Sequence, residues 1–165
     1  MGISRLCVFC SSSDQVPPLF REDAGSLARA MAREGIALVY GGGSVGLMGV
    51  LADRILEEGG EVIGVIPRFL RTKELAHEGI TRMIVTETMH ERKAQMSRLS
   101  DAFAVLPGGF GTLDEFFEIL TWRQLGIHDR PIVVANTGGW FSPLLDFLRR
   151  ATEFRTVSEV HLGLF

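Results

Sequence analysis

The sequence lacks long apolar stretches and an excess of positive charge. None of its apolar runs reaches the ~18–20 residues that a helix needs to cross a bilayer, and the N-terminus has no basic region followed by a secretory apolar region. Lys and Arg total 17 against 20 Asp and Glu, a formal net charge of -3, whereas proteins that bind nucleic acid polymers are usually basic. We therefore expect a cytoplasmic protein with no membrane partner and no nucleic acid polymer as partner.

Cysteine and histidine are too few and too scattered to indicate a metal site. The four histidines show no metal-ligand spacing and have no cysteine cluster beside them. Cys7 and Cys10 form a C-x-x-C, but it lies inside an apolar run of strand character, where residues three apart point to opposite faces. A redox C-x-x-C is expected where a helix begins, so we interpret both cysteines as structural and expect no metal.

Short apolar runs alternate with longer segments of helical spacing. The runs predict strands at residues 6–10, 36–40, 62–66, 83–85, 103–106 and 132–135. The helical segments lie near residues 19–31, 47–56, 89–99, 113–125 and 140–147. Such alternation is typical of parallel strands joined by helical crossovers. We predict a single α/β domain over residues 1–165, with a Rossmann-like doubly wound parallel sheet, helices on both faces, and ligands bound at the carboxyl ends of the strands.

Glycine is abundant, with 19 residues or about 12% against a typical ~7%. One cluster, residues 41–46 (GGGSVG), follows a predicted strand and matches G-x-G-x-x-G, in which backbone N–H groups and a helix N-terminus face an anion. A dinucleotide site needs an acidic residue at the end of the next strand, where Pro67 and Arg68 stand instead. A P-loop needs a lysine at Leu47. Alone, this loop is weak evidence.

A second glycine loop, residues 107–112 (PGGFGT), also follows a strand and opens a helix. Two such loops can form one anion cradle, so we favour phosphate binding over glycines that only relieve packing. Thr112 and Glu115 match the Thr-x-x-Glu capping box, as do Thr88 and Glu91. Glu115 is thus either a helix cap or a carboxylate that reaches a bound ribose, where it would stabilise an oxocarbenium-like transition state or activate water.

The segment HERKAQMSR carries Arg92, Lys93 and Arg98 on one predicted helix. At 100° per residue, Arg92 and Arg98 diverge by ~120°, so they cannot both point squarely into one pocket. Either one of them is structural or one serves the site of a neighbouring subunit, with a solvated basic face as the remaining alternative. The spacing favours an active site near an oligomer interface.

Four segments in this order, LVYGGGSVGLMG, MHERKAQM, DAFAVLPGGFGTLDE and TWRQLGIHDRP, resemble the Lonely Guy (LOG) family over about Cys7 to Pro143. The resemblance implies a Rossmann-like homodimer with active sites at the interface and no metal or organic cofactor. It also implies a phosphoribohydrolase, a hydrolase that cleaves the N-glycosidic bond of a cytokinin riboside 5'-monophosphate. The expected substrate is AMP or N6-prenylated AMP, and the products are free base and ribose 5-phosphate.

The resemblance also implies the roles of individual residues. The catalytic pair falls on Arg98 and Glu115, and a substrate-contacting pair on Arg92 and Lys93. The phosphate and ribose loop with its flanks falls on Gly108, Gly109, Phe110, Gly111, Thr112, Leu113 and Asp114. Other substrate-binding positions fall on Ser12, Gly41, Gly42, Gly43, Glu74 and Thr121. Phe110 and Asp114 stand where many members have Tyr and Glu, so the loss of a tyrosine hydroxyl would alter one contact.

Three other functions compete with this interpretation. A non-catalytic protein with the same pocket would bind the nucleotide without cleaving it. A pyridoxal phosphate decarboxylase is disfavoured because the lysines are few and none has the expected strand context. An NAD(P) oxidoreductase is disfavoured because the acidic residue after the first glycine loop is missing.

Overall fold

The computed structural model describes residues 2–71 and 75–165. The described residues form six strands in one sheet with the order β4-β3-β2-β1-β5-β6, and every pairing is parallel. The strands are β1 (Arg5–Phe9), β2 (Ala37–Tyr40), β3 (Val62–Pro67), β4 (Arg82–Thr86), β5 (Ala102–Val105) and β6 (Ile132–Val134). The predicted α/β class with a parallel sheet is confirmed.

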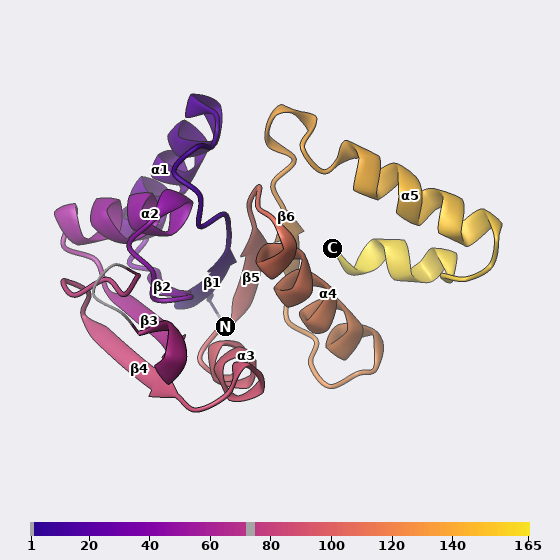
Figure 1. Cartoon of the computed structure of the whole chain (residues 1–165). Helices are drawn as coiled ribbons and strands as arrows, with labels where there is room; N and C mark the ends of the chain where they lie inside the picture. The colour runs from indigo at the N-terminus through magenta and orange to yellow at the C-terminus, as the bar shows by residue number, and fades with distance from the viewer. Residues whose placement is uncertain (1, 72–74) are drawn as a thin grey trace.

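Helices cover both faces of the sheet (Figure 1). The helices are α1 (Pro18–Arg33), α2 (Gly46–Glu57), α3 (Met89–Arg98), α4 (Phe110–Gln124) and α5 (Ser142–Glu153). Neighbouring residues of β2 show the division, because Leu38 packs in one core with α1 and α2 while Val39 packs in the other with α3 and α4. Within the described ranges, no helix is both long and apolar enough to cross a membrane.

Local sequence signals explain the apolar face of α1 and the point where this helix ends. Its buried residues recur at helical spacing, as in Phe20, Ala24 and Met31, which gives the helix one apolar face. The helix ends at Arg33 and is followed by Gly35, whose φ of +66° is in the left-handed region that favours glycine. Ile36 N–H then donates to Met31 O at 2.8 Å and Gly35 N–H to Ala32 O at 3.1 Å, so two free carbonyls of the last turn are paired.

The strand order creates a switch point between β1 and β5. The chain moves outward from β1 through β2 and β3 to β4, and β5 then pairs with the other side of β1. The loops that follow β1 and β5 therefore leave the same edge of the sheet side by side, and Ser11 N–H donates to Pro107 O across them at 3.1 Å. Such a point is where parallel sheets usually bind ligands.

Cys7 and Cys10 are free and buried in separate cores on the two faces of the sheet. Their side chains therefore pack apart, as expected for residues three apart along an extended chain. Burial raises the pKa of both thiols. The structural interpretation of this C-x-x-C fits their placement.

Gly46 opens α2 with a φ of +65° directly beneath the loop that follows β1. A Cβ at this position would lie 2.7 Å from Ser11 O, closer than a Cβ can approach another atom without displacing it. Gly35 has almost the same φ, but a Cβ there would meet nothing within 4 Å. The two glycines therefore separate the cost of backbone conformation from the cost of a steric clash.

We expect Gly35→Ala to lower the free energy of unfolding by about 1–2 kcal/mol, the cost of a left-handed non-glycine residue. Gly46→Ala should cost a further ~1–3 kcal/mol, because the loop that follows β1 must also move. Urea denaturation of both variants measures the difference. Equal losses in the two variants would contradict the close approach at Gly46.

Candidate active site

A cleft of about 460 Å³ opens at the carboxyl ends of the strands around the switch point, within the volume range of small-molecule sites. Its polar wall comes from the loops after β1, β2 and β5 and from α3 and α4. The polar lining residues are Ser11, Ser12, Ser13, Gly41, Gly43, Arg92, Gly109, Gly111, Thr112 and Glu115. Its apolar lining includes Met48, Ile66, Leu70, Leu75, Met89 and Phe110.

The N-terminus of α4 opens into this cleft. The helix begins at Phe110 with Gly109 as N-cap, and no side chain of the described residues caps it. The first N–H groups of an α-helix have no partner within the helix and carry the positive end of its dipole. A Cβ at Gly109 or Gly111 would meet nothing within 4 Å, so the approach to these N–H groups is open. This end of α4 is suited to a phosphate.

The N-terminus of α2, at the end of the first glycine loop, is already bound by the protein itself. Gly46 N–H donates to Asp14 Oδ1 at 3.0 Å, and Leu47 N–H donates to Ser11 O at 2.9 Å. The bond from Gly46, followed by one from Arg21, holds the pKa of Asp14 below its ordinary value. The two glycine loops are therefore not equivalent, because only the loop before α4 ends at an open helix N-terminus.

Glycines 41 and 43 have a different role, which is to leave space. A Cβ at Gly41 would collide with the guanidinium of Arg92, and one at Gly43 would collide with the side chain of Met48. Arg92 and Met48 can approach the end of β2 closely only because these side chains are missing. The first glycine loop thus admits the arginine that faces the cleft.

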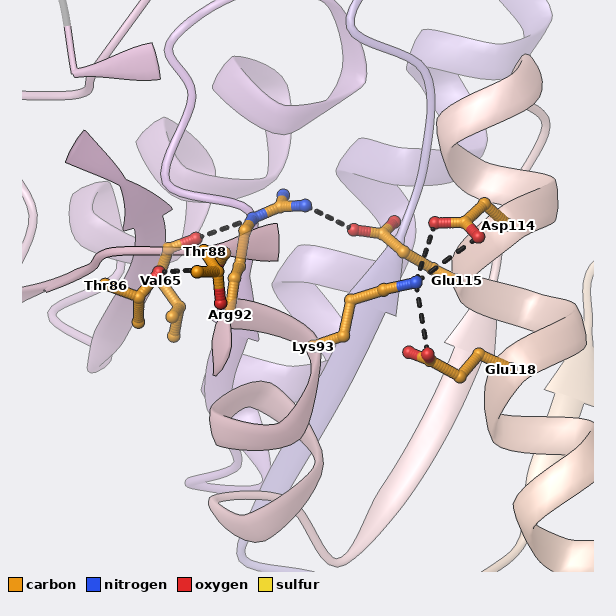
Figure 2. A network of polar contacts seen from close by, with 8 residues as sticks. All are labelled: Val65, Thr86, Thr88, Arg92, Lys93, Asp114, Glu115 and Glu118. Carbon is orange, nitrogen blue, oxygen red and sulfur yellow. Dashed lines mark hydrogen bonds and ion pairs between the residues drawn. The ribbon is translucent and has the colours of Figure 1, made fainter. Parts of the chain in front are cut away.

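Arg92 and Glu115 form a buried ion pair in the cleft wall (Figure 2). Arg92 Nη1 donates to Glu115 Oε1 at 2.9 Å, and Arg92 Nε donates to Val65 O at 2.9 Å. The two residues are only 9% and 8% exposed. Burial raises the pKa of Glu115, and the charge of Arg92 opposes this rise. The result is a partly desolvated carboxyl beside the open N-terminus of α4.

Glu115 does not cap α4. The helix begins before Thr112, so Thr112 and Glu115 both lie within it and neither side chain caps its first turn. The other match is a true capping box: Thr88 Oγ1 accepts from Glu91 N–H at 3.1 Å, and Glu91 Oε2 accepts from Thr88 N–H at 3.3 Å. The structure therefore rules out the helix-cap interpretation of Glu115 and places this residue in the cleft lining.

Lys93 does not line the cleft and joins α3 to α4 through Asp114 and Glu118 (Figure 2). Its Nζ lies 3.0 Å from Asp114 Oδ2 and 3.1 Å from Glu118 Oε1. Burial lowers the pKa of Lys93, but the hydrogen bonds to Asp114 and Glu118 outweigh burial and raise it. Lys93 and Asp114 therefore hold the two helices together beside the Arg92–Glu115 pair, whereas the resemblance places them in contact with substrate.

Arg98 and Thr121 lie outside this cleft. Arg98 is the last residue of α3, exposed and about 9 Å along the helix axis from Arg92. Thr121 is exposed on α4 and donates to Phe117 O at 2.7 Å. The chain therefore brings Glu115 together with Arg92 rather than with Arg98.

Several other residues that were predicted to bind substrate are not part of the cleft lining or are outside the described residues. Gly42, Gly108 and Leu113 do not line the cleft. A Cβ at Gly108 would collide with Thr112, so this glycine permits the tight turn into α4. Glu74 lies outside the described residues. Apart from Phe110, sequence reasoning missed the apolar lining residues, since nothing in the sequence distinguishes them from core residues. In the described ranges, no group of His, Cys, Asp and Glu is arranged to hold a metal ion.

Replacing Arg92 with Met should raise the pKa of Glu115 further, because the cation that favours its ionised form is lost while burial remains. Lys93→Met should raise it less, because Lys93 has the weaker influence. Carboxyl-carbon NMR titration measures both shifts. Because the folded pKa is raised, the stability that Glu115 contributes is present below its unfolded pKa and is lost as pH rises through the folded one. An unchanged midpoint in Arg92→Met would contradict the proposed electrostatics.

Comparison with known proteins places the chain in a family. The family described as "Possible lysine decarboxylase" matches residues 48–165. The chain is 47% identical over 149 residues to "Probable cytokinin riboside 5'-monophosphate phosphoribohydrolase LOGL3" of Oryza sativa subsp. japonica, covering 90% of this chain and 71% of that protein. It is 46% identical over 149 residues to "Cytokinin riboside 5'-monophosphate phosphoribohydrolase LOG5" of Arabidopsis thaliana, covering 90% and 65%.

The solved structures with the same fold are more distant in sequence. The molybdenum cofactor carrier protein of Chlamydomonas reinhardtii has a TM-score of 0.70 at 23% identity, over 88% of this chain and 83% of that one. This likeness concerns the Rossmann-like fold alone. The chain spans 61% of the length of the related LOGL2 of Oryza sativa subsp. japonica and 72% of that of LOG2 of Arabidopsis thaliana. On its identity to the rice and Arabidopsis proteins, and on the extent of both matches, the chain belongs to the LOG family.

Proposed function

We propose that this chain is a phosphoribohydrolase that hydrolyses the N-glycosidic bond of N6-prenylated adenosine 5'-monophosphate, releasing the free base and ribose 5-phosphate. The curated relatives are named cytokinin riboside 5'-monophosphate phosphoribohydrolases. The observation that carries the proposal is the buried carboxyl of Glu115 beside the open N-terminus of α4 in one cleft. A carboxylate and an anion site in the same cleft suit a ribose 5-phosphate unit.

The phosphate would bind the N–H groups at the start of α4, with hydroxyls of the loop after β1 beside it. The ribose then lies over Glu115. As the C1'–N9 bond breaks, its electron pair goes to the base, which takes up a proton, and positive charge develops on the ribose. The Glu115 carboxylate stabilises that charge, and water supplies the hydroxyl that adds to C1'. Arg92 holds the carboxylate in place and favours its ionised form.

The apolar lining of the cleft supports a substituted base. Residues Met48, Ile66, Leu70 and Leu75 bring aliphatic and thioether side chains to this wall. An N6-prenyl group would be removed from water against such a surface, whereas plain adenine would leave more of it uncovered. This lining favours prenylated AMP over AMP as the substrate.

Arg98 and the cleft mouth are consistent with a homodimer in which each subunit completes the other's site. Arg98 is exposed and does not line its own cleft. Phe110 lines the cleft and is 93% exposed, so a large aromatic side chain, of a type that is enriched at protein interfaces, is open to contact with a partner. We propose that Arg98 acts in the cleft of the partner subunit, where it supports the departing base or orients Glu115.

Incubation with isopentenyladenosine 5'-monophosphate should release free base, measured by chromatography. Glu115→Gln should lower kcat by about 100-fold or more, because the neutral amide cannot stabilise the developing positive charge. The riboside without phosphate should be a poor substrate, by about 100-fold in kcat/KM, because it cannot use the N–H groups of α4.

Glu118→Gln is the matched control, because this carboxylate lies on the same helix outside the cleft lining and Gln can still accept from Lys93. Nucleotide binding without release of base would support the non-catalytic alternative. A Glu115→Gln variant with the full rate would remove Glu115 from the mechanism.

The interfacial role of Arg98 predicts complementation between two inactive variants. Arg98→Ala and Glu115→Gln should each be nearly inactive alone. After mixing under conditions that exchange subunits, activity should recover to about a quarter of wild type, because half of the dimers are mixed and each holds one intact site. No recovery, with subunit exchange verified by mass spectrometry, would place both residues in the same subunit's site or remove Arg98 from it.

A further inference from the structure

Residues 75–79, here called the strap, lie against the first glycine loop. Ser44 N–H donates to Leu75 O at 2.9 Å, and His77 N–H donates to Gly42 O at 2.9 Å. Between these bonds, Ala76 and Gly43 form an antiparallel bridge. Leu75 also lines the apolar part of the cleft. The strap therefore supplies part of the wall that would face the base.

One side chain ties the strap to α2. His77 Nε2 lies 2.8 Å from Asp53 Oδ1, and His77 Nδ1 accepts from Gly79 N–H at 3.1 Å. A ring nitrogen that accepts a hydrogen bond carries no proton, so the proton of the neutral ring is on Nε2 and is donated to Asp53. The His77 side chain is only 13% exposed, whereas Asp53 is 63% exposed. The imidazole thus uses both nitrogens to connect the strap with α2.

We propose that the His77–Asp53 hydrogen bond is a positioning contact that sets selectivity for the base. It holds the strap on the glycine loop, so that Leu75 stays in the cleft wall. Neither His77 nor Asp53 lines the cleft, so both act through Leu75. This inference rests on the proposed function, because it assigns the strap side of the cleft to the base.

The position of the strap determines which kinetic constant should respond. The Arg92–Glu115 pair and the N-terminus of α4 come from other elements than the strap, and no hydrogen bond between described residues joins them to it. A loosened strap should therefore weaken binding of the N6 substituent and leave the chemical step unchanged. The KM for prenylated AMP should rise, while kcat for both nucleotides and KM for plain AMP should change little.

The first experiment measures steady-state kinetics of four variants with isopentenyladenosine 5'-monophosphate and with AMP. Asp53→Ala should raise KM for the prenylated nucleotide about 3- to 10-fold, the range of one lost hydrogen bond. Asp53→Asn and His77→Gln should stay near wild type, since the amide oxygen of Asn still accepts and the amide N–H of Gln can replace Nε2–H. Glu57→Ala is the control, because Glu57 lies on α2 and pairs with Arg54.

A double variant tests whether the two residues act as one contact. Asp53→Ala combined with His77→Ala should have the same KM as His77→Ala alone, because the same hydrogen bond is removed in both. Additive effects of the two substitutions would overturn the proposal. An equal rise of KM for AMP and for prenylated AMP would also overturn it, since the strap would then not discriminate between bases.

Hydrogen exchange separates this inference from the proposed function. Asp53→Ala should speed exchange of the Ser44 and His77 amides, which bond across the strap, without speeding that of the amides in the middle of α2. If wild type releases no base while these amides lose protection in Asp53→Ala, the proposed function fails, but the hydrogen bond still holds the strap in position. If base is released but both exchange and KM are unchanged in Asp53→Ala, the positioning contact is wrong.

Discussion

The burial of the Glu115 carboxyl beside Arg92 is the constraint on which the site depends. A buried carboxylate without a partner would cost several kcal/mol or take up a proton. Arg92 reaches it because Gly41 leaves room at the end of β2 and because Val65 O holds the other edge of the guanidinium. Lys93 then fixes α3 against α4, so that the two charged groups keep their alignment. The space at Gly41, the acceptor Val65 O and the contacts of Lys93 between the two helices all position the same ion pair.

The two glycine loops show how the same motif takes different roles in one sheet. Both follow a strand and open a helix, yet the N–H groups at the start of α2 are bound by Asp14 and Ser11. Of these two helices, only α4 begins without a capping hydrogen bond from a side chain of the described residues. The loop before α2 instead supports the strap and makes room for Arg92. Whether a helix N-terminus is open to an anion thus depends on whether a neighbouring loop already accepts hydrogen bonds from its first N–H groups.

Prediction from sequence was strongest where the physics is local. Periodicity located the strands and helices, the two cysteines of the C-x-x-C lie on opposite faces of the sheet as expected, and Thr88 and Glu91 form the expected capping box. Thr112 and Glu115 do not form a capping box, because α4 starts at Phe110, earlier than its apolar spacing indicates. The apolar cleft lining other than Phe110 was missed, because residues such as Leu75 have no local signal that separates a ligand-facing position from a core position.

The sequence by itself determined the α/β class, the strand ends that carry glycine, and the family resemblance, because hydrophobic period and motif spacing are properties of short segments. Tertiary structure alone decided that Glu115 pairs with Arg92 and that Lys93 joins two helices. It also decided that Arg98 lies outside the cleft lining of its own chain. Glu115 is far along the chain from Arg92, and the basic residues of α3 project from that helix in different directions. Only the packing of α3 and α4 against the sheet therefore sets which charged groups meet.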